Sequence, residues 1–208
     1  MTVETDRPLR ADAARNADRI LRAAREIYAE LGPDAPMDAI ARRAGVGERT
    51  LYRRFPTKGE LSRAVIDQSI AETLTPVIVR ALRSRNPLRG LEKLLEAAIA
   101  LGAREHSALT AARRTGSLTD VSVQLDAALV ELTTRAQDAG LVRADLVAAD
   151  LPRMVAMLYS VLATMDPASD GWRRYVALLI DAIATANPSR LPRAVPIRYV
   201  QPLDEWPI

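Results

Sequence analysis

Basic side chains gather between residues 42 and 58, where six cations accompany a single acid and the local charge is +5. Residues 1–60 hold twelve basic and ten acidic residues, so the positive charge is concentrated in this short stretch. Guanidinium and ammonium groups at this density suit contacts with phosphate oxygens, and a tyrosine among them can donate a further hydrogen bond. On its own, a basic run is more commonly a solvated helix face. The charged residues are Arg42, Arg43, Glu48, Arg49, Arg53, Arg54 and Lys58.

The residue types that other chemistries require are scarce. The chain has no cysteine, which excludes a disulfide framework, a thiolate nucleophile and a cysteine metal site. The single histidine, His106, argues against a zinc site and a Ser-His-Asp arrangement. No Glu-x-x-His pair is available for a carboxylate-bridged metal site. We therefore predict no metal, no cofactor and no enzymatic activity.

Helices must position the basic stretch, because no segment shows the two-residue alternation of a strand. Residues 37–44 and 48–55 form two short helices around Gly45-Val46-Gly47, with Leu51 and Phe55 inward, which is a helix-turn-helix layout. Before them, residues 13–31 present one apolar face, made of Ile20, Ala24, Ile27, Tyr28 and Leu31. The remaining helical segments are predicted at 57–82, 87–99, 106–116, 121–136, 151–165 and 172–183.

Capping residues and prolines set the expected boundaries. Thr57 and Asn86 are predicted N-caps, and Pro76 predicts a kink or break near Thr75. The fold class is therefore all-α, with about nine helices. We expect a three-helix domain over residues 1–60, a helical domain over 61–186, and an extended tail over 187–208, which holds five of the 13 prolines.

No segment predicts a membrane span or a secretory leader. The longest uncharged apolar stretch, residues 154–165, is shorter than the roughly 20 residues that a bilayer requires. The arginines of the first 30 residues are followed by no apolar core of a signal peptide. We therefore expect a cytoplasmic protein without membrane contact.

The stretch from Ile40 to Leu61 resembles the DNA-binding domain of the TetR family of bacterial transcriptional regulators. Its residues IARRAGVGERTLYRRFPTKGEL follow the family pattern I-A-x-x-A-G-V-S-x-x-T-L-Y-x-x-F-x-x-K-x-x-L. The chain departs from the pattern at Gly47, where the family usually has serine, and near Pro36, where serine or threonine often caps the helix. The resemblance covers about residues 13–65, and the remainder matches in length, helical character and helix number.

This resemblance implies a duplex-DNA partner and residue roles in the second short helix. Arg49 and Thr50 are expected to approach base edges or adjacent phosphates, and Arg49 suits bidentate pairing with guanine. Tyr52 and Lys58 match family positions that contact phosphates, while Glu48 either accepts from a cytosine amine or caps the helix. The predicted DNA-binding residues are Arg43, Gly47, Glu48, Arg49, Thr50, Tyr52, Arg53, Arg54 and Lys58.

The resemblance also implies a homodimer on a palindromic operator, and a repressor that a small-molecule effector releases. The family places the dimer interface in the last two helices, and our candidates there are Leu151, Val155, Leu158, Leu162, Tyr175, Leu179 and Ile183. The effector is expected in an apolar cavity enclosed by the fourth to eighth helices, and the candidate lining residues are Leu101, Leu125, Leu129, Met157 and Trp172. Because few polar groups fall on inward faces, an apolar effector is favoured.

Two other classes of function stay open at this stage. One is a helical small-molecule carrier or enzyme without DNA binding, and the other is an adaptor that uses the terminal helices alone. The first predicts turnover or stoichiometric ligand binding without DNA affinity, and the second predicts hetero-association that substitutions at Tyr52 and Lys58 leave unchanged. The identities of the effector, the operator and the target genes are not encoded in any pattern here, nor is the choice between repressor and activator.

Overall fold

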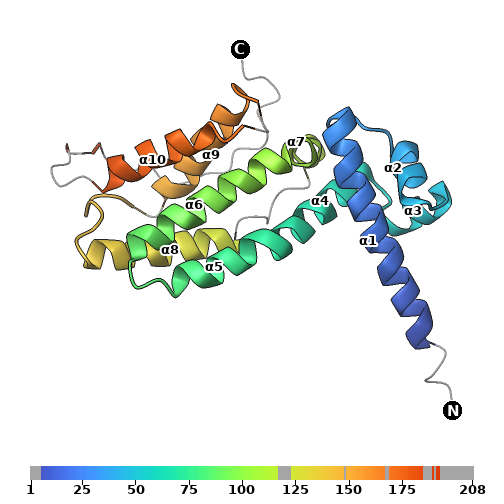
Figure 1. Ribbon diagram of the computed structural model, residues 1–208, viewed down its shortest axis with the longest axis horizontal. Coiled ribbons are helices and arrows are strands. Elements are labelled where there is room, and N and C mark those ends of the chain that lie inside the picture. Colours follow the sequence, from blue (N-terminus) through green and yellow to red (C-terminus); the bar gives the residue numbers. More distant parts are fainter. Residues whose placement is uncertain are drawn as a thin grey trace. The chain divides into compact units, whose positions relative to one another are not determined.

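The computed structural model describes residues 6–116, 123–147, 149–166, 169–184, 189, 191 and 192, with the backbone alone for residues 6–14. Every regular element in these ranges is a helix, so the all-α prediction is confirmed (Figure 1). The elements are α1 (Asp6–Leu31), α2 (Met37–Ala44), α3 (Glu48–Arg54), α4 (Lys58–Ser69), the π-helical η1 (Ile70–Leu74), α5 (Thr75–Leu82), α6 (Pro87–Arg104), α7 (His106–Arg114), α8 (Val123–Asp138), α9 (Asp150–Leu162) and α10 (Trp172–Ile183).

The chain divides into two compact units. The first unit comprises residues 1–68 and 105–119, and the second comprises residues 69–104 and 120–208. Helix α7 therefore belongs to the first unit, where it packs against α1. Two stretches that are far apart in the sequence thus build the first unit together.

The core of the first unit forms where α1 packs against α2, and α2 against α3. Of the inward positions predicted for α1, Leu31 in the last turn is exposed, and the buried ones are Ile20, Ala24, Ile27 and Tyr28. The buried Tyr28 hydroxyl and the Ser62 hydroxyl of α4 are 2.7 Å apart and share a hydrogen bond. Burial raises the pKa of Tyr28. This bond ties α4 to α1 inside the core.

Helix α6 is the centre of the second unit. It contacts α5, α8, α9 and α10, which surround it in Figure 1. A helix enclosed in this way must be apolar on most of its circumference. The fully buried side chains of α6 meet that requirement, and they are Leu91, Leu94, Leu95, Ala98 and Ile99.

The segment predicted as one interrupted helix over residues 57–82 is divided into α4, η1 and α5. Pro76 has no N–H and lies in the first turn of α5, so the regular ladder cannot run through it. The five π-helical residues of η1 widen the turn just before this point. The break expected near Thr75 is confirmed, and this division explains why the structure has more elements than the nine predicted.

Helix ends follow the predicted capping chemistry. The Thr57 hydroxyl accepts a 3.1 Å hydrogen bond from the Glu60 N–H, and the Asn86 side chain accepts one of 3.0 Å from the Arg89 N–H. Most of the predicted tail, and Val121 in the segment predicted at 121–136, lie outside the described residues. In the part of the chain that the structure describes, no helix is long and apolar enough to cross a bilayer.

Candidate nucleic-acid interface

A sharp turn joins α2 to α3 and depends on Gly45. This residue has φ +64°, a left-handed conformation that side chains disfavour. The Gly45 N–H donates to the Arg42 carbonyl at 3.2 Å, and the Val46 N–H donates to the Ala41 carbonyl at 3.1 Å, which closes the end of α2. Gly47 is extended, with φ −70°, and begins α3 as its N-cap without a side chain. The predicted helix-turn-helix is therefore formed.

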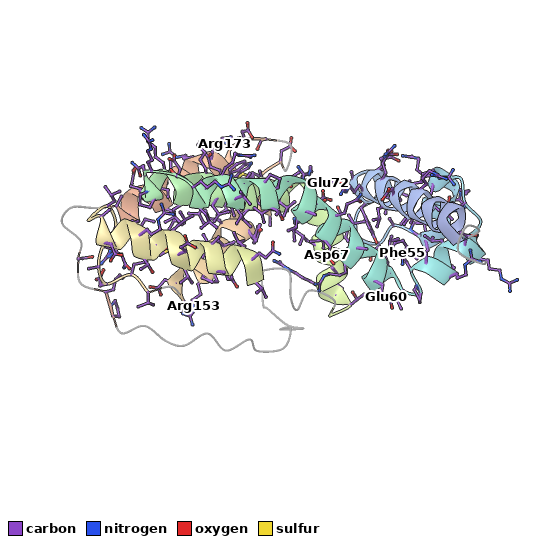
Figure 2. The ribbon with its side chains drawn as sticks, turned by 90° about the horizontal axis from the view of Figure 1, so that it is seen from below. Phe55, Glu60, Asp67, Glu72, Arg153 and Arg173 are labelled. Carbon is purple, nitrogen blue, oxygen red and sulfur yellow. The ribbon has the colours of Figure 1, made fainter. Side chains whose placement is uncertain are left out.

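Two apolar side chains fix the rotation of α3. Leu51 and Phe55, four residues apart, are buried in the first unit as predicted. The opposite face is left in solvent, and Tyr52 on it is 46% exposed. Arg49 and Arg53 also lie one turn apart on the exposed surface, so their Cα atoms are separated by about 6 Å along the axis. Figure 2 labels Phe55 at the end of α3 and Glu60 just beyond it in α4.

Arg43 has a different environment from the one predicted. Its guanidinium binds Glu30 of α1 through two nitrogens, at 2.9 and 2.7 Å, and Glu26 through one, at 3.0 Å. Hydrogen bonding to these carboxylates raises the pKa of Arg43, and the same pairing lowers the pKa of Glu30. The pairing holds α2 against α1, and the contact of Arg43 with DNA stays a prediction.

The cations of α3, in contrast, are available. Arg42 at the end of α2 pairs with Asp38 at 2.6 Å. Arg49, Arg53 and Arg54 form no ion pair with any described residue. The Arg54 guanidinium lies 5.4 Å from the centre of the Phe55 ring, a cation–π distance. Folding thus neutralises the cations of α2 and leaves those of α3 free for an anionic partner.

Lys58 begins α4 in a cluster that the sequence does not predict. Burial lowers the pKa of Lys58, with nearby Asp34 and Arg114 acting in opposite directions. Arg114 comes from α7 and binds the Asp34 carboxylate at 2.9 and 3.1 Å. It lies 56 positions after Lys58 in the chain, and no local pattern connects the two. Arg114 is therefore the cation that sequence reasoning missed.

The predicted effector residues are not gathered in one place. Leu101, Leu125 and Leu129 are buried in the core of the second unit. Met157, in contrast, is 68% exposed, so it does not line an enclosed site. Trp172 is buried and borders a surface groove.

Most of the predicted interface residues face the interior of their own chain. Tyr175 is 40% exposed and Leu179 is partly buried, whereas the others are buried in the core of the second unit: Leu151, Val155, Leu158, Leu162 and Ile183. This stripe packs within the chain, and the assignment of these residues to a dimer interface stays a prediction. The exposed apolar residues on the same two helices are Met157, Tyr175 and Leu178.

Comparison with known proteins gives the same picture of the amino-terminal part. The family model described as bacterial regulatory proteins, tetR family, matches residues 20–65. The TetR transcription regulatory protein from Mycobacterium vanbaalenii is 32% identical, over 86% of this chain and 100% of that one, with a TM-score of 0.57. The chain belongs to the TetR family. No curated protein matches it.

Other TetR-family structures share the fold. A TetR transcriptional regulator from Streptomyces coelicolor is 28% identical, over 82% of this chain and 99% of that one, with a TM-score of 0.57. The TetR-family regulator PfmR from Thermus thermophilus is 18% identical, with 80% and 97% coverage and a TM-score of 0.62, and it is similar in fold alone. The match of the TetR family model at residues 20–65 includes the whole of α2 and α3, so it contains the free cations.

Proposed function

We propose that this TetR-family protein is a sequence-specific DNA-binding regulator of transcription. The observation that carries the proposal is the presence of three exposed arginines without ion pairs on α3, while the neighbouring arginines of α2 are paired. An α-helix with its side chains is about 10–12 Å in diameter, which fits a major groove about 12 Å wide. Helix α3 is accordingly the reading helix.

Each side chain has a proposed task. Arg49 reads a guanine, with Thr50 and Glu48 beside it, and Tyr52 donates to a phosphate. Arg53, Arg54 and Lys58 neutralise phosphates of the duplex backbone. The backbone N–H groups of the first turn of α3, which follows Gly47, also favour a phosphate. Arg43 acts as a positioning residue that holds α2 against α1.

Fluorescence anisotropy with duplexes from the region upstream of the gene tests this proposal. The Arg49→Ala variant should lose about 1–3 kcal/mol of discrimination between the specific and a scrambled duplex. The Tyr52→Phe variant should weaken binding to both duplexes equally. Arg83→Ala, which removes an exposed cation of the second unit, is the matched control and should bind as the wild type does. Equal binding by the Arg49 and Arg83 variants would refute the readout by α3.

We propose that the protein acts as a homodimer on a palindromic operator. Two reading helices about 34–36 Å apart would reach successive turns of the duplex. The revised interface is the exposed apolar face of α9 and α10, which contains Met157, Tyr175 and Leu178 with Leu179 at its edge. Sedimentation of Leu178→Glu should show a monomer, and Ala177→Glu, at an exposed position of α10 about 100° around the helix from Leu178 and 160° from Tyr175, serves as the charge control. A dimer that survives Leu178→Glu would exclude this face.

The remaining part of the proposal is release by a small-molecule effector, which makes the protein a cytoplasmic repressor without catalytic activity. An effector bound in the second unit, near Leu101, Leu125 and Leu129, changes DNA affinity only if it binds the two dimer shapes unequally. The coupling is reciprocal, so saturating DNA should weaken effector binding by the same factor. Native mass spectrometry of freshly purified protein would reveal a retained ligand, and a reporter strain lacking the protein should show derepression.

A further inference from the structure

A surface groove of about 450 Å³ lies on the second unit between α5, α6 and the first turn of α10. Its volume falls within the range of small-molecule sites. Helix α5 contributes Val77 and Arg80 to its lining, α6 contributes Arg89, Ala97 and Ala100, and α10 contributes Trp172. Aliphatic and aromatic side chains thus form its walls, and charged groups stand among them.

The charges of the groove are mostly positive. Four cations lie against one acid, Glu96, which binds Lys93 at 2.7 Å and Arg173 at 3.5 Å. Arg80 and Arg89, in contrast, form no ion pair with any described residue. Since Glu96 is shared by two cations, an excess of three positive charges remains in the groove. An anionic occupant would meet that excess.

The unpaired cations Arg80 and Arg89 and the apolar wall lie towards different ends of the groove, and Arg173 beside that wall is paired with Glu96. Helices α5 and α6 form a hairpin, as Figure 1 shows, and Arg89 lies close to its turn. Ala100 lies eleven residues further along α6, which corresponds to about 16 Å. At the α10 wall, the Arg173 guanidinium lies over the Trp172 ring at 4.6 Å from its centre, and Figure 2 labels Arg173. The groove therefore suits an elongated molecule that is charged at one end.

We propose that this groove binds an amphiphilic anion, with its carboxylate or phosphate head at Arg80 and Arg89 and its apolar body against Ala97, Ala100 and Trp172. The site stays accessible in the proposed dimer, because Arg173 is about 160° around α10 from Tyr175. Any effect of this ligand on DNA binding rests on the proposed function, whereas the binding itself does not.

Isothermal titration calorimetry of the full chain tests the proposal with three probes below their micellar concentrations: decanoate, decyl phosphate and decyltrimethylammonium. At least one of the two anions should bind with a stoichiometry of one per chain, and the cation of equal chain length should not bind. Decanoate and decyl phosphate differ in head group and by one methylene of the tail, worth about 0.8 kcal/mol, so a larger difference in affinity shows which head the arginines prefer.

Two pairs of charge reversals locate the site. The double variant Arg80→Glu/Arg89→Glu should weaken binding of the anion by about tenfold or more. The double variant Arg83→Glu/Arg85→Glu makes the same change in net charge at exposed positions of the same hairpin outside the groove, and it should bind as the wild type does. Ala97→Phe, which fills the apolar part without changing charge, should also weaken binding. Circular dichroism verifies that each variant is folded.

Failure of both anions to bind the wild type would overturn the proposal. So would unchanged binding by the Arg80/Arg89 variant or by Ala97→Phe, or an equal loss in the Arg83/Arg85 control. DNA binding by the same variants, measured by anisotropy, tests the proposed function separately. A protein that binds the anion but no duplex would support the groove as an anion site and refute the proposed DNA-binding function.

Discussion

The contact between Gly102 of α6 and Tyr159 of α9 allows a sharp test of packing in the second unit. A β-carbon added at Gly102 would overlap Cε1 of the Tyr159 ring, and would lie 2.7 Å from Cδ1 and 3.1 Å from Cζ. The ring cannot move away freely, because the Tyr159 hydroxyl donates a 3.0 Å hydrogen bond to the Ala98 carbonyl. The Gly102→Ala substitution must therefore displace the ring or separate the two helices.

The expected change in the free energy of unfolding combines two destabilising contributions with one that stabilises. Overpacking of this kind costs about 1–3 kcal/mol, and loss of the hydroxyl bond adds about 1 kcal/mol. Against this, alanine is a better helix former than glycine by about 1 kcal/mol. In the wild-type background, Gly102→Ala should thus lower the free energy of unfolding. In a Tyr159→Ala background the collision is absent, and the same substitution should raise it.

Urea unfolding at a fixed protein concentration measures all four members of this double-mutant cycle. The sign of the Gly102→Ala effect should reverse between the two backgrounds. If Gly102→Ala lowered the stability equally in both, the steric explanation would be wrong and the glycine would have some other role.

Three further outcomes are expected. Gly47→Ser supplies the missing N-cap hydroxyl of α3 and should raise the free energy of unfolding by a few tenths of a kcal/mol, seen as a slightly higher melting temperature. Gly47→Ala, which supplies no hydroxyl, should lower both. Arg43→Ala should lower both thermal stability and DNA affinity, because the Arg43 side chain pairs with Glu26 and Glu30 and so connects α2 to α1. Arg49→Ala removes no such ion pair and should lower only DNA affinity. The pKa of Asp145 is lowered to about 2 by its bond to Arg143, so its stabilising contribution is present above its usual pKa of 3.8 and is lost as the pH falls towards 2. Acid unfolding should therefore be less steep for Asp145→Asn than for the wild type over that interval.

The helix-turn-helix could be predicted because its signals are local. Gly45 must adopt a left-handed conformation at the turn, Leu51 and Phe55 are separated by one helical turn, and Thr57 caps the next helix. Each of these features depends on neighbours within a few residues. Their order along the chain was therefore sufficient to predict both the motif and the exposed face of α3.

The availability of a cation is not a local property. Arg43 reads in the sequence like Arg49, yet its partners Glu26 and Glu30 lie 17 and 13 positions away on α1. Arg114 reaches the Lys58 region only because α7 packs in the first unit. Sequence spacing gives no measure of such distances, so the division of the arginines into paired and free ones required the folded structure.

The amino-acid sequence by itself determined the all-α class, the helix-turn-helix and the concentration of positive charge on it, because propensities, caps and periodicity act within a turn or two of helix. The tertiary structure alone decided what each apolar stripe packs against. Periodicity is the same for a face buried within a chain and for one buried between chains, so the pattern at Leu151 and Leu158 does not by itself distinguish the core, where they lie, from an interface. Which surfaces remain exposed, Met157 and Leu178 among them, depends on how the helices pack around α6.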